Sequence, residues 1–235
     1  MSTPITVNDD IITKFDEIER ILDVTYGPRV LRENGDPVSE LVGTILSQNT
    51  SDVNTARSMA RLREEFPTWE EVRRAPVEDV IDAIRSGGLA NIKGPRIQAA
   101  LDHIAIRQGD THLEFLQDLP LDEAMSWLVS IDGVGPKTAA CVLLFSLGRP
   151  AMPVDTHVGR VMTRLGVVPD RTSTLTKQRI LESLIGPDPH RTYAVHVETI
   201  SHGQQICKAQ RPKCDICPLV HLCDFAQSIA GDLVL

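Results

Sequence analysis

The chain has 235 residues, 42% of them apolar, which is enough for one sizeable hydrophobic core or two small ones and argues against a disordered chain. Its formal net charge of −8 excludes a generally polycationic surface, so a nucleic-acid partner would need a local basic surface. The sequence has no apolar run that spans a bilayer and no signal-peptide pattern at its start, so we expect a cytoplasmic protein with no membrane partner.

Apolar residues recur at spacings of three and four between Pro, Gly and Ser/Thr/Asp boundaries, which predicts an all-α fold. Pro37, Pro76, Pro95 and Pro136 are expected just inside helix starts, where a missing amide costs little. A break at 148–150 marks the expected domain boundary. The predicted helices, in chain order, cover residues 11–24, 38–46, 51–65, 69–74, 77–85, 95–107, 121–130, 136–147, 156–165, 174–184 and 191–205.

A glycine-rich turn joins two of these helices. It reads Asp132-Gly133-Val134-Gly135, and Pro136 follows as the expected first residue of the next helix. Such a turn predicts a helix-hairpin-helix whose free amides lie at the positive end of a helix dipole, which suits a phosphate group. An ordinary turn between helices is the alternative interpretation.

Lys137 falls in the first turn of the helix after this hairpin, where the helix dipole disfavours a cation and so favours the neutral, nucleophilic amine. The alternative is a solvated lysine that contacts a phosphate. A second motif, Pro-Val-Asp155-Thr-His157, ends a loop and begins another helix. Asp155 is expected to cap that helix, and a capping carboxylate can also serve in catalysis.

Four of the five cysteines, Cys207, Cys214, Cys217 and Cys223, lie close together, with six, two and five residues between successive members. This crowding predicts a metal site, and the unequal spacing favours a [4Fe–4S] cluster over structural zinc, which usually uses paired short knuckles. Three cations, Lys208, Arg211 and Lys213, stand between the first two cysteines with no acid among them. They supply the local basic surface that DNA binding requires.

These motifs together resemble the endonuclease III branch of the helix-hairpin-helix DNA glycosylases. The segments LVSIDGVGPKTAACVLLFSLG and MPVDTHVGRVMTRLG and the cysteine loop match that family's signatures in order, and the resemblance covers roughly residues 11–226. It implies two helical lobes with the active site in the cleft between them. The expected lobes are a helical bundle of residues 30–149, which carries the hairpin, and a cluster lobe of residues 150–235 together with 1–29.

The resemblance also implies roles for single residues. Lys137 would be the Schiff-base nucleophile and Asp155 the carboxylate that activates it. Gln48 or Asn49 would fill the stack left by a flipped nucleotide, although helix-start capping is an equal alternative for both, and Leu89 would be an apolar wedge in the other strand. The implied DNA contacts are Gln48, Asn49, Leu89, Gly133, Val134, Gly135, His157, Lys208, Arg211 and Lys213.

The activity implied is that of a bifunctional DNA glycosylase/AP lyase of base excision repair, which removes oxidised pyrimidines from double-stranded DNA with a damaged base or abasic site. A monomer associated with the nucleoid is expected. Two alternatives remain: a monofunctional adenine or mismatch glycosylase, against which Lys137 argues because those enzymes usually carry Ser or Tyr there, and a non-catalytic iron–sulfur DNA-binding or redox module. Asp132, Pro136 and Ala90 depart from residues frequent in the family, which leaves the substrate range open.

Overall fold

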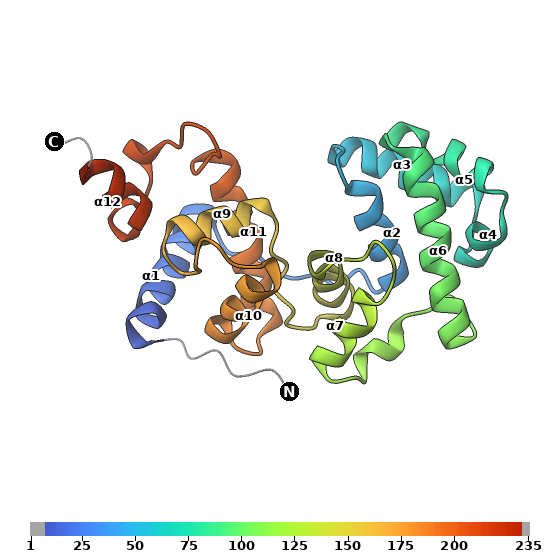
Figure 1. Ribbon diagram of the computed structural model, residues 1–235, viewed down its shortest axis with the longest axis horizontal. Helices are drawn as coiled ribbons and strands as arrows, with labels where there is room; N and C mark the ends of the chain where they lie inside the picture. Colours follow the sequence, from blue (N-terminus) through green and yellow to red (C-terminus); the bar gives the residue numbers. More distant parts are fainter. Residues whose placement is uncertain (1–7, 232–235) are drawn as a thin grey trace. The chain divides into compact units, whose positions relative to one another are not determined.

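A computed structural model describes residues 8–231, with side chains for residues 8–229, and contains no β-strand in that range (Figure 1). No helix within these residues is both long enough and apolar enough to cross a membrane. The helices are α1 (Asp9–Tyr26), α2 (Pro37–Ser47), α3 (Asp52–Glu65), α4 (Trp69–Arg74), α5 (Val77–Ala83), α6 (Ala90–Gln108), α7 (Leu121–Val129), α8 (Pro136–Cys141), α9 (Thr156–Arg164), α10 (Thr174–Ile185), α11 (Pro189–Gln205) and α12 (Asp224–Gly231).

The chain divides into two compact units. Residues 33–149 form one, the central unit, and the described residues toward both chain ends, 8–32 and 150–231, form the other, the terminal unit. The sequence placed the first boundary three residues earlier, after residue 29, and the second at the same position. The segment before the central unit therefore crosses from one unit to the other at residues 32 and 33.

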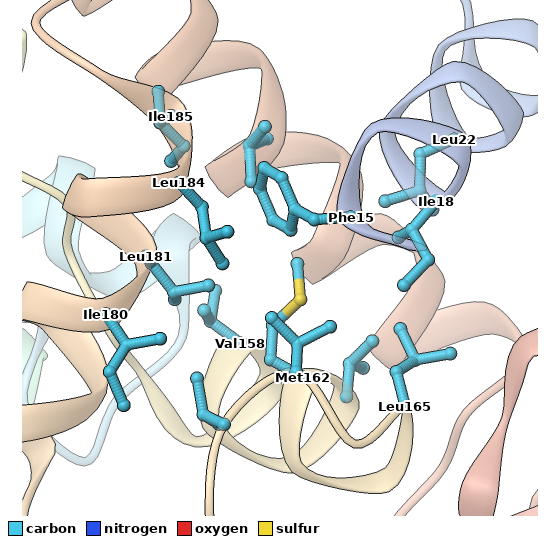
Figure 2. Close-up of a cluster of buried hydrophobic side chains, with 14 of the residues drawn as sticks. Phe15, Ile18, Leu22, Val158, Met162, Leu165, Ile180, Leu181, Leu184 and Ile185 are labelled. Atoms are coloured by element: carbon cyan, nitrogen blue, oxygen red, sulfur yellow. The ribbon is translucent and has the colours of Figure 1, made fainter. Parts of the chain in front are cut away.

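The N-terminal helix joins the terminal unit because one of its faces is apolar. Phe15, Ile18 and Leu22 recur at helical spacing and are at most 1% exposed, and they pack against side chains of α9 and α10 (Figure 2). Burial of each such side chain contributes about 1.5–3 kcal/mol. Figure 1 shows α1 among α9, α10 and α11, and Arg191 of α11 adds an ion pair to Glu19 of α1 at 2.6 Å.

The central unit is arranged around α2, which is buried along most of its length. Leu41, Val42, Ile45 and Leu46 have no exposed surface, and α2 packs against α3, α6 and α8. Asp36 caps this helix by accepting a hydrogen bond from the Ser39 amide at 2.8 Å. A central helix that is buried along most of its length holds the ends of its neighbours in fixed places, including the start of α8 with Lys137.

The all-α prediction is confirmed, but some helix boundaries were wrong. Helix α6 begins at Ala90 and contains Pro95, which the sequence placed at a helix start; here tertiary context overrides the low helix propensity of an interior proline. The predicted helix 136–147 becomes a π-helical turn at Val142–Ser146. Helix α12 was not predicted, since its eight residues follow the cysteine loop directly with no strong start signal.

Candidate active site

The predicted hairpin connects α7 and α8 within the central unit. Gly133 has a φ of 79°, a left-handed conformation that favours glycine, whereas Gly135 has an ordinary φ of −92°. Ile131 and Val134 are buried, and the Val134 amide donates to the Ile131 carbonyl at 3.0 Å. Among the described residues no partner takes the Gly133 or Gly135 amide, so these two remain available to a phosphate and Val134 does not.

Lys137 is the second residue of α8 and is half-buried. Pro136 occupies the first position of this helix, as predicted, and the four residues after Lys137 are buried, which fixes the helix start. Glu40 of α2 lies within electrostatic reach of Lys137. Burial raises the pKa of the Glu40 carboxyl, while hydrogen bonds from Asn34 at 2.7 Å and Thr44 at 3.4 Å and the charge of Lys137 oppose the rise.

Asp155 caps α9 in the terminal unit, as the sequence predicted. Its Oδ1 accepts a hydrogen bond from the Val158 amide at 2.7 Å. The side chain remains partly exposed, and its Oδ2 takes no hydrogen bond from another described residue. One carboxylate oxygen is thus used by the helix and the other is available for chemistry.

His157 follows in the first turn of α9, and its Nδ1 lies 3.1 Å from an Arg160 guanidinium nitrogen. The same guanidinium donates to the carbonyls of Gly203 and Cys207 at 2.9 and 3.0 Å. A side chain at Gly203 would collide with His157, because its Cβ would lie 2.9 Å from Nδ1. His157 is therefore held in place by α11 and by the start of the cysteine loop.

Gln48, Asn49 and Leu89 all lie at helix ends of the central unit. The capping alternative for Gln48 and Asn49 is wrong, because Ser51 caps α3 and Gln48 follows the end of α2. Asn49 is exposed with a φ of 54°, and Leu89 is 50% exposed with a φ of 52°. A large apolar side chain held outside the core in a left-handed conformation is a costly arrangement that points to function.

The cysteine loop, residues 207–223, brings its four cysteines to one cavity. Cys207, Cys214, Cys217 and Cys223 line it together, none is in a disulfide, and Cys141 lies buried in the other unit. No three His, Cys, Asp or Glu side chains in the described part of the chain gather closely enough to hold a single metal ion. Four thiols around one cavity, at the unequal spacing of this loop, fit the ligand set of an iron–sulfur cluster.

Arg164 of α9 lies beside these cysteines. The Arg164 guanidinium donates to Cys207 Sγ at 3.4 Å and to the carbonyls of Lys208 and Ala209 at 2.7 and 3.0 Å. Burial raises the pKa of the Cys217 thiol to about 11, with smaller contributions from the other three cysteines. Thiolates bound to iron carry no proton, so cluster binding removes the protons that burial would otherwise hold.

Lys208, Arg211 and Lys213 are exposed on the cysteine loop, and no acid in the described part of the chain forms an ion pair with them. Arg211 adopts a φ of 51°. The loop therefore presents three unneutralised cations on a protein of negative net charge.

Sequence reasoning missed three residues at these sites: Glu40, Arg96 and Arg164. Arg96 donates to Gln48 Oε1 at 3.0 Å, and its side chain lies where a Cβ on Gly133 would stand. The contacts of Arg96 and Arg164 join residues far apart in the chain, at sequence separations of 48 from Gln48 and 43 from Cys207. A local motif carries no signal for such pairs.

Comparison with known proteins gives two matching family patterns. Residues 42–187 match the HhH-GPD superfamily base excision DNA repair proteins, and residues 207–223 match the iron–sulfur binding domain of endonuclease III. Endonuclease III of Thermotoga maritima is 34% identical over 202 residues, which is 84% of this chain and 87% of that protein. The chain spans only 10% of rice ROS1C, 13% of Arabidopsis thaliana ROS1 and 66% of a putative Arabidopsis DNA glycosylase.

Two solved structures resemble the whole chain. A non-covalent endonuclease III–DNA complex has a TM-score of 0.76 at 28% identity, and a trapped endonuclease III–DNA covalent intermediate has 0.74 at 30% identity. Both cover 96% of this chain and all of the solved one. The chain therefore belongs to the HhH-GPD superfamily of base excision DNA repair proteins and is similar to endonuclease III along most of its length, and its cysteine loop holds a [4Fe–4S] cluster.

Proposed function

We propose that the protein is a bifunctional DNA glycosylase and AP lyase that removes oxidised pyrimidines from double-stranded DNA. The observation that carries this proposal is Lys137, an amine at the start of α8, next to the phosphate-binding hairpin. A monofunctional glycosylase has no need of a nucleophilic amine at this position, whereas a lyase that works through an imine does.

The proposed reaction begins when a damaged nucleotide leaves the stack. The neutral amine of Lys137 attacks C1′ of the sugar, the bond to the base breaks, and the base leaves with a proton. The amine nitrogen loses its proton, the C1′–O4′ bond of the sugar ring opens and O4′ takes up a proton, which leaves an imine at C1′. This imine makes a hydrogen on C2′ acidic, and its loss expels the 3′ phosphate. Asp155 accepts the proton of the amine or stabilises the positive charge that forms on the sugar, using the oxygen that does not cap α9.

The remaining residues bind and shape the DNA. The amides of Gly133 and Gly135 bind a backbone phosphate at the N-terminal end of α8, and Lys208, Arg211 and Lys213 of the cysteine loop contact further phosphates. Gln48 or Asn49 fills the vacated position, and Leu89 enters between bases of the other strand. The cluster supplies the iron–thiolate bonds that hold the cysteine loop in shape. We expect the protein to act as a monomer.

Borohydride trapping tests this proposal, since it reduces an enzyme–DNA imine to a stable amine. The protein is incubated with a duplex that contains thymine glycol, with a duplex that contains an abasic site, and with an adenine–guanine mismatch. Covalent adducts with the first two substrates and none with the mismatch are expected. Base release without any adduct would instead indicate a monofunctional glycosylase, and binding without base release a non-catalytic module.

A further inference from the structure

Lys93 of α6 is a buried cation with an unusual set of partners. Its side chain is 2% exposed, and Nζ donates to the carbonyls of Leu46 at 2.6 Å and Gly87 at 3.0 Å. No carboxylate pairs with it among the described residues, and burial lowers the pKa of this amine. A buried lysine that neutralises no charge is costly, so fold stability alone does not explain its presence.

The two carbonyls belong to the two segments that are proposed to enter the DNA. Leu46 is the second-last residue of α2, so its carbonyl has no amide partner within the helix, and the plug segment, residues 47–49, follows at once. Gly87 lies two residues before Leu89 in the wedge turn, residues 84–89. The ammonium group of Lys93 therefore binds a backbone carbonyl next to the plug segment and one within the wedge turn.

Arg96, nearly one turn further along α6, holds the side chain of the plug segment. It donates to Gln48 Oε1 at 3.0 Å. Its side chain also passes so close to the hairpin that a Cβ on Gly133 would lie 2.7 Å from its Cδ and Nε atoms. Thus α6 links the plug segment, the wedge turn and the phosphate-binding hairpin.

The wedge turn is supported from a second side by α3. Ser58 Oγ lies 3.2 Å from the Ile84 carbonyl and 2.9 Å from Ser86 Oγ, and a Cβ on Gly87 would lie 2.7 Å from the same Ser58 oxygen. Asn49 and Leu89 both have left-handed backbones, at φ 54° and 52°. Such conformations persist where surrounding contacts impose them, and here the contacts come from Ser58, Lys93 and Arg96.

We propose that Lys93 is a positioning residue that keeps the plug segment and the wedge turn at a fixed spacing, so that both enter the duplex in one step. Arg96 aims Gln48 in the same arrangement. This inference rests on the proposed function, because Lys93 itself does not contact the DNA. Lys93 acts only through the plug segment and the wedge turn. It explains why a charge is kept at a site that an apolar side chain would fill.

The test replaces Lys93 by methionine, which has a similar length and no donor. Two rates are measured in single turnover: base excision from a thymine glycol duplex, and β-elimination at an abasic site in single-stranded DNA, which needs neither plug nor wedge. We expect Lys93→Met to slow the duplex reaction at least tenfold and the single-strand reaction less than twofold. Lys177→Met is the matched control, since Lys177 donates to Thr163 Oγ1 at 2.7 Å in the terminal unit.

A second readout does not depend on chemistry. In a Lys137→Gln background, 2-aminopurine placed beside the lesion reports unstacking by its fluorescence, and Lys93→Met should reduce the amplitude or rate of that signal. If Lys93→Met does not fold, Arg96→Gln serves instead. This substitution leaves the packing around Lys93 intact and removes the hydrogen bond that holds Gln48.

Three results overturn the proposal. The first is an unchanged duplex rate in folded Lys93→Met or Arg96→Gln protein. The second is an equal loss on duplex and single-stranded substrates, which indicates a general structural effect. The third is full additivity of Lys93→Met with Leu89→Ala, since a residue that acts through the wedge loses its effect once the wedge is removed. An inactive parent protein would instead contradict the proposed function.

Discussion

Asp155 combines two roles that substitution can separate. Asn caps helices about as well as Asp, so Asp155→Asn should leave the free energy of unfolding nearly unchanged. The change removes the negative charge, and we expect base excision to slow roughly a hundredfold or more if the carboxylate acts in the reaction. Thermal unfolding and single-turnover excision measured together decide this, and an active Asp155→Asn protein would leave Asp155 only as a cap.

For Leu89 we predict a substitution that lowers activity and leaves stability nearly unchanged. The side chain is 50% exposed, so Leu89→Ala removes little buried surface and should change the free energy of unfolding by less than about 0.5 kcal/mol. Excision from duplex DNA should slow, because an apolar side chain in the gap stabilises the flipped state. Leu89→Met is the control that keeps the apolar bulk. Equal excision rates in Leu89→Ala and parent protein would exclude a wedge role.

At the scale of single residues, the sequence predicted what local chemistry determines. The cap at Asp155, the position of Lys137 in the first helical turn and the glycine-rich turn at 132–135 each follow from a few adjacent residues. The contacts of Lys93 and Arg96 did not follow, because they join turns that meet only after the central unit has folded.

Among the helices of the terminal unit, α11 carries a buried acid. Glu198 is 1% exposed, and neither carboxylate oxygen has a hydrogen-bond partner among the described residues. Burial raises its pKa from an ordinary 4.5 to about 7; the charges of Asp23 and Glu19 raise it further, and that of Arg29 opposes them. The folded state therefore holds this proton more tightly than the unfolded chain.

Because the folded pKa lies above the unfolded one, stability from Glu198 is complete below about pH 4.5 and declines as the pH rises to about 7. The shift corresponds to a loss of up to about 3 kcal/mol over this interval. Glu198→Gln removes the titration, so the difference in unfolding free energy between variant and parent should grow in the variant's favour from pH 4.5 to 8. Chemical denaturation at several pH values measures it, and a constant difference would contradict this burial effect.

Helix existence was predictable and helix ends less so. Periodic apolar residues indicated all helices from α1 to α11, because each buries one face. The start of α6 was misplaced since Pro95 gives a strong start signal while Leu89, which directly precedes the helix, makes no side-chain cap. The π-helical turn after α8 depends on packing against α2 and has no sequence signature.

For the molecule as a whole, the net charge of −8 means that DNA affinity depends on a few local cations. Replacing Lys208, Arg211 or Lys213 by alanine should weaken binding of undamaged duplex and reduce the slope of log affinity against log salt by about 0.9 for each lost phosphate contact. Lys14→Ala is a control, because Lys14 pairs with Asp224 at 2.6 Å. Identical slopes in parent and loop variants would exclude these phosphate contacts.

The central claim is that Lys137 is the nucleophile, and mapping the borohydride adduct tests it most directly. Parent protein, Lys137→Gln and the control Lys177→Gln are each incubated with thymine glycol duplex and borohydride, and the cross-linked peptide is identified by mass spectrometry. The account predicts an adduct on Lys137 in the parent and in Lys177→Gln, and none in Lys137→Gln, which still binds damaged DNA. A trapped adduct in Lys137→Gln, or one mapped to another amine in the parent, would contradict it.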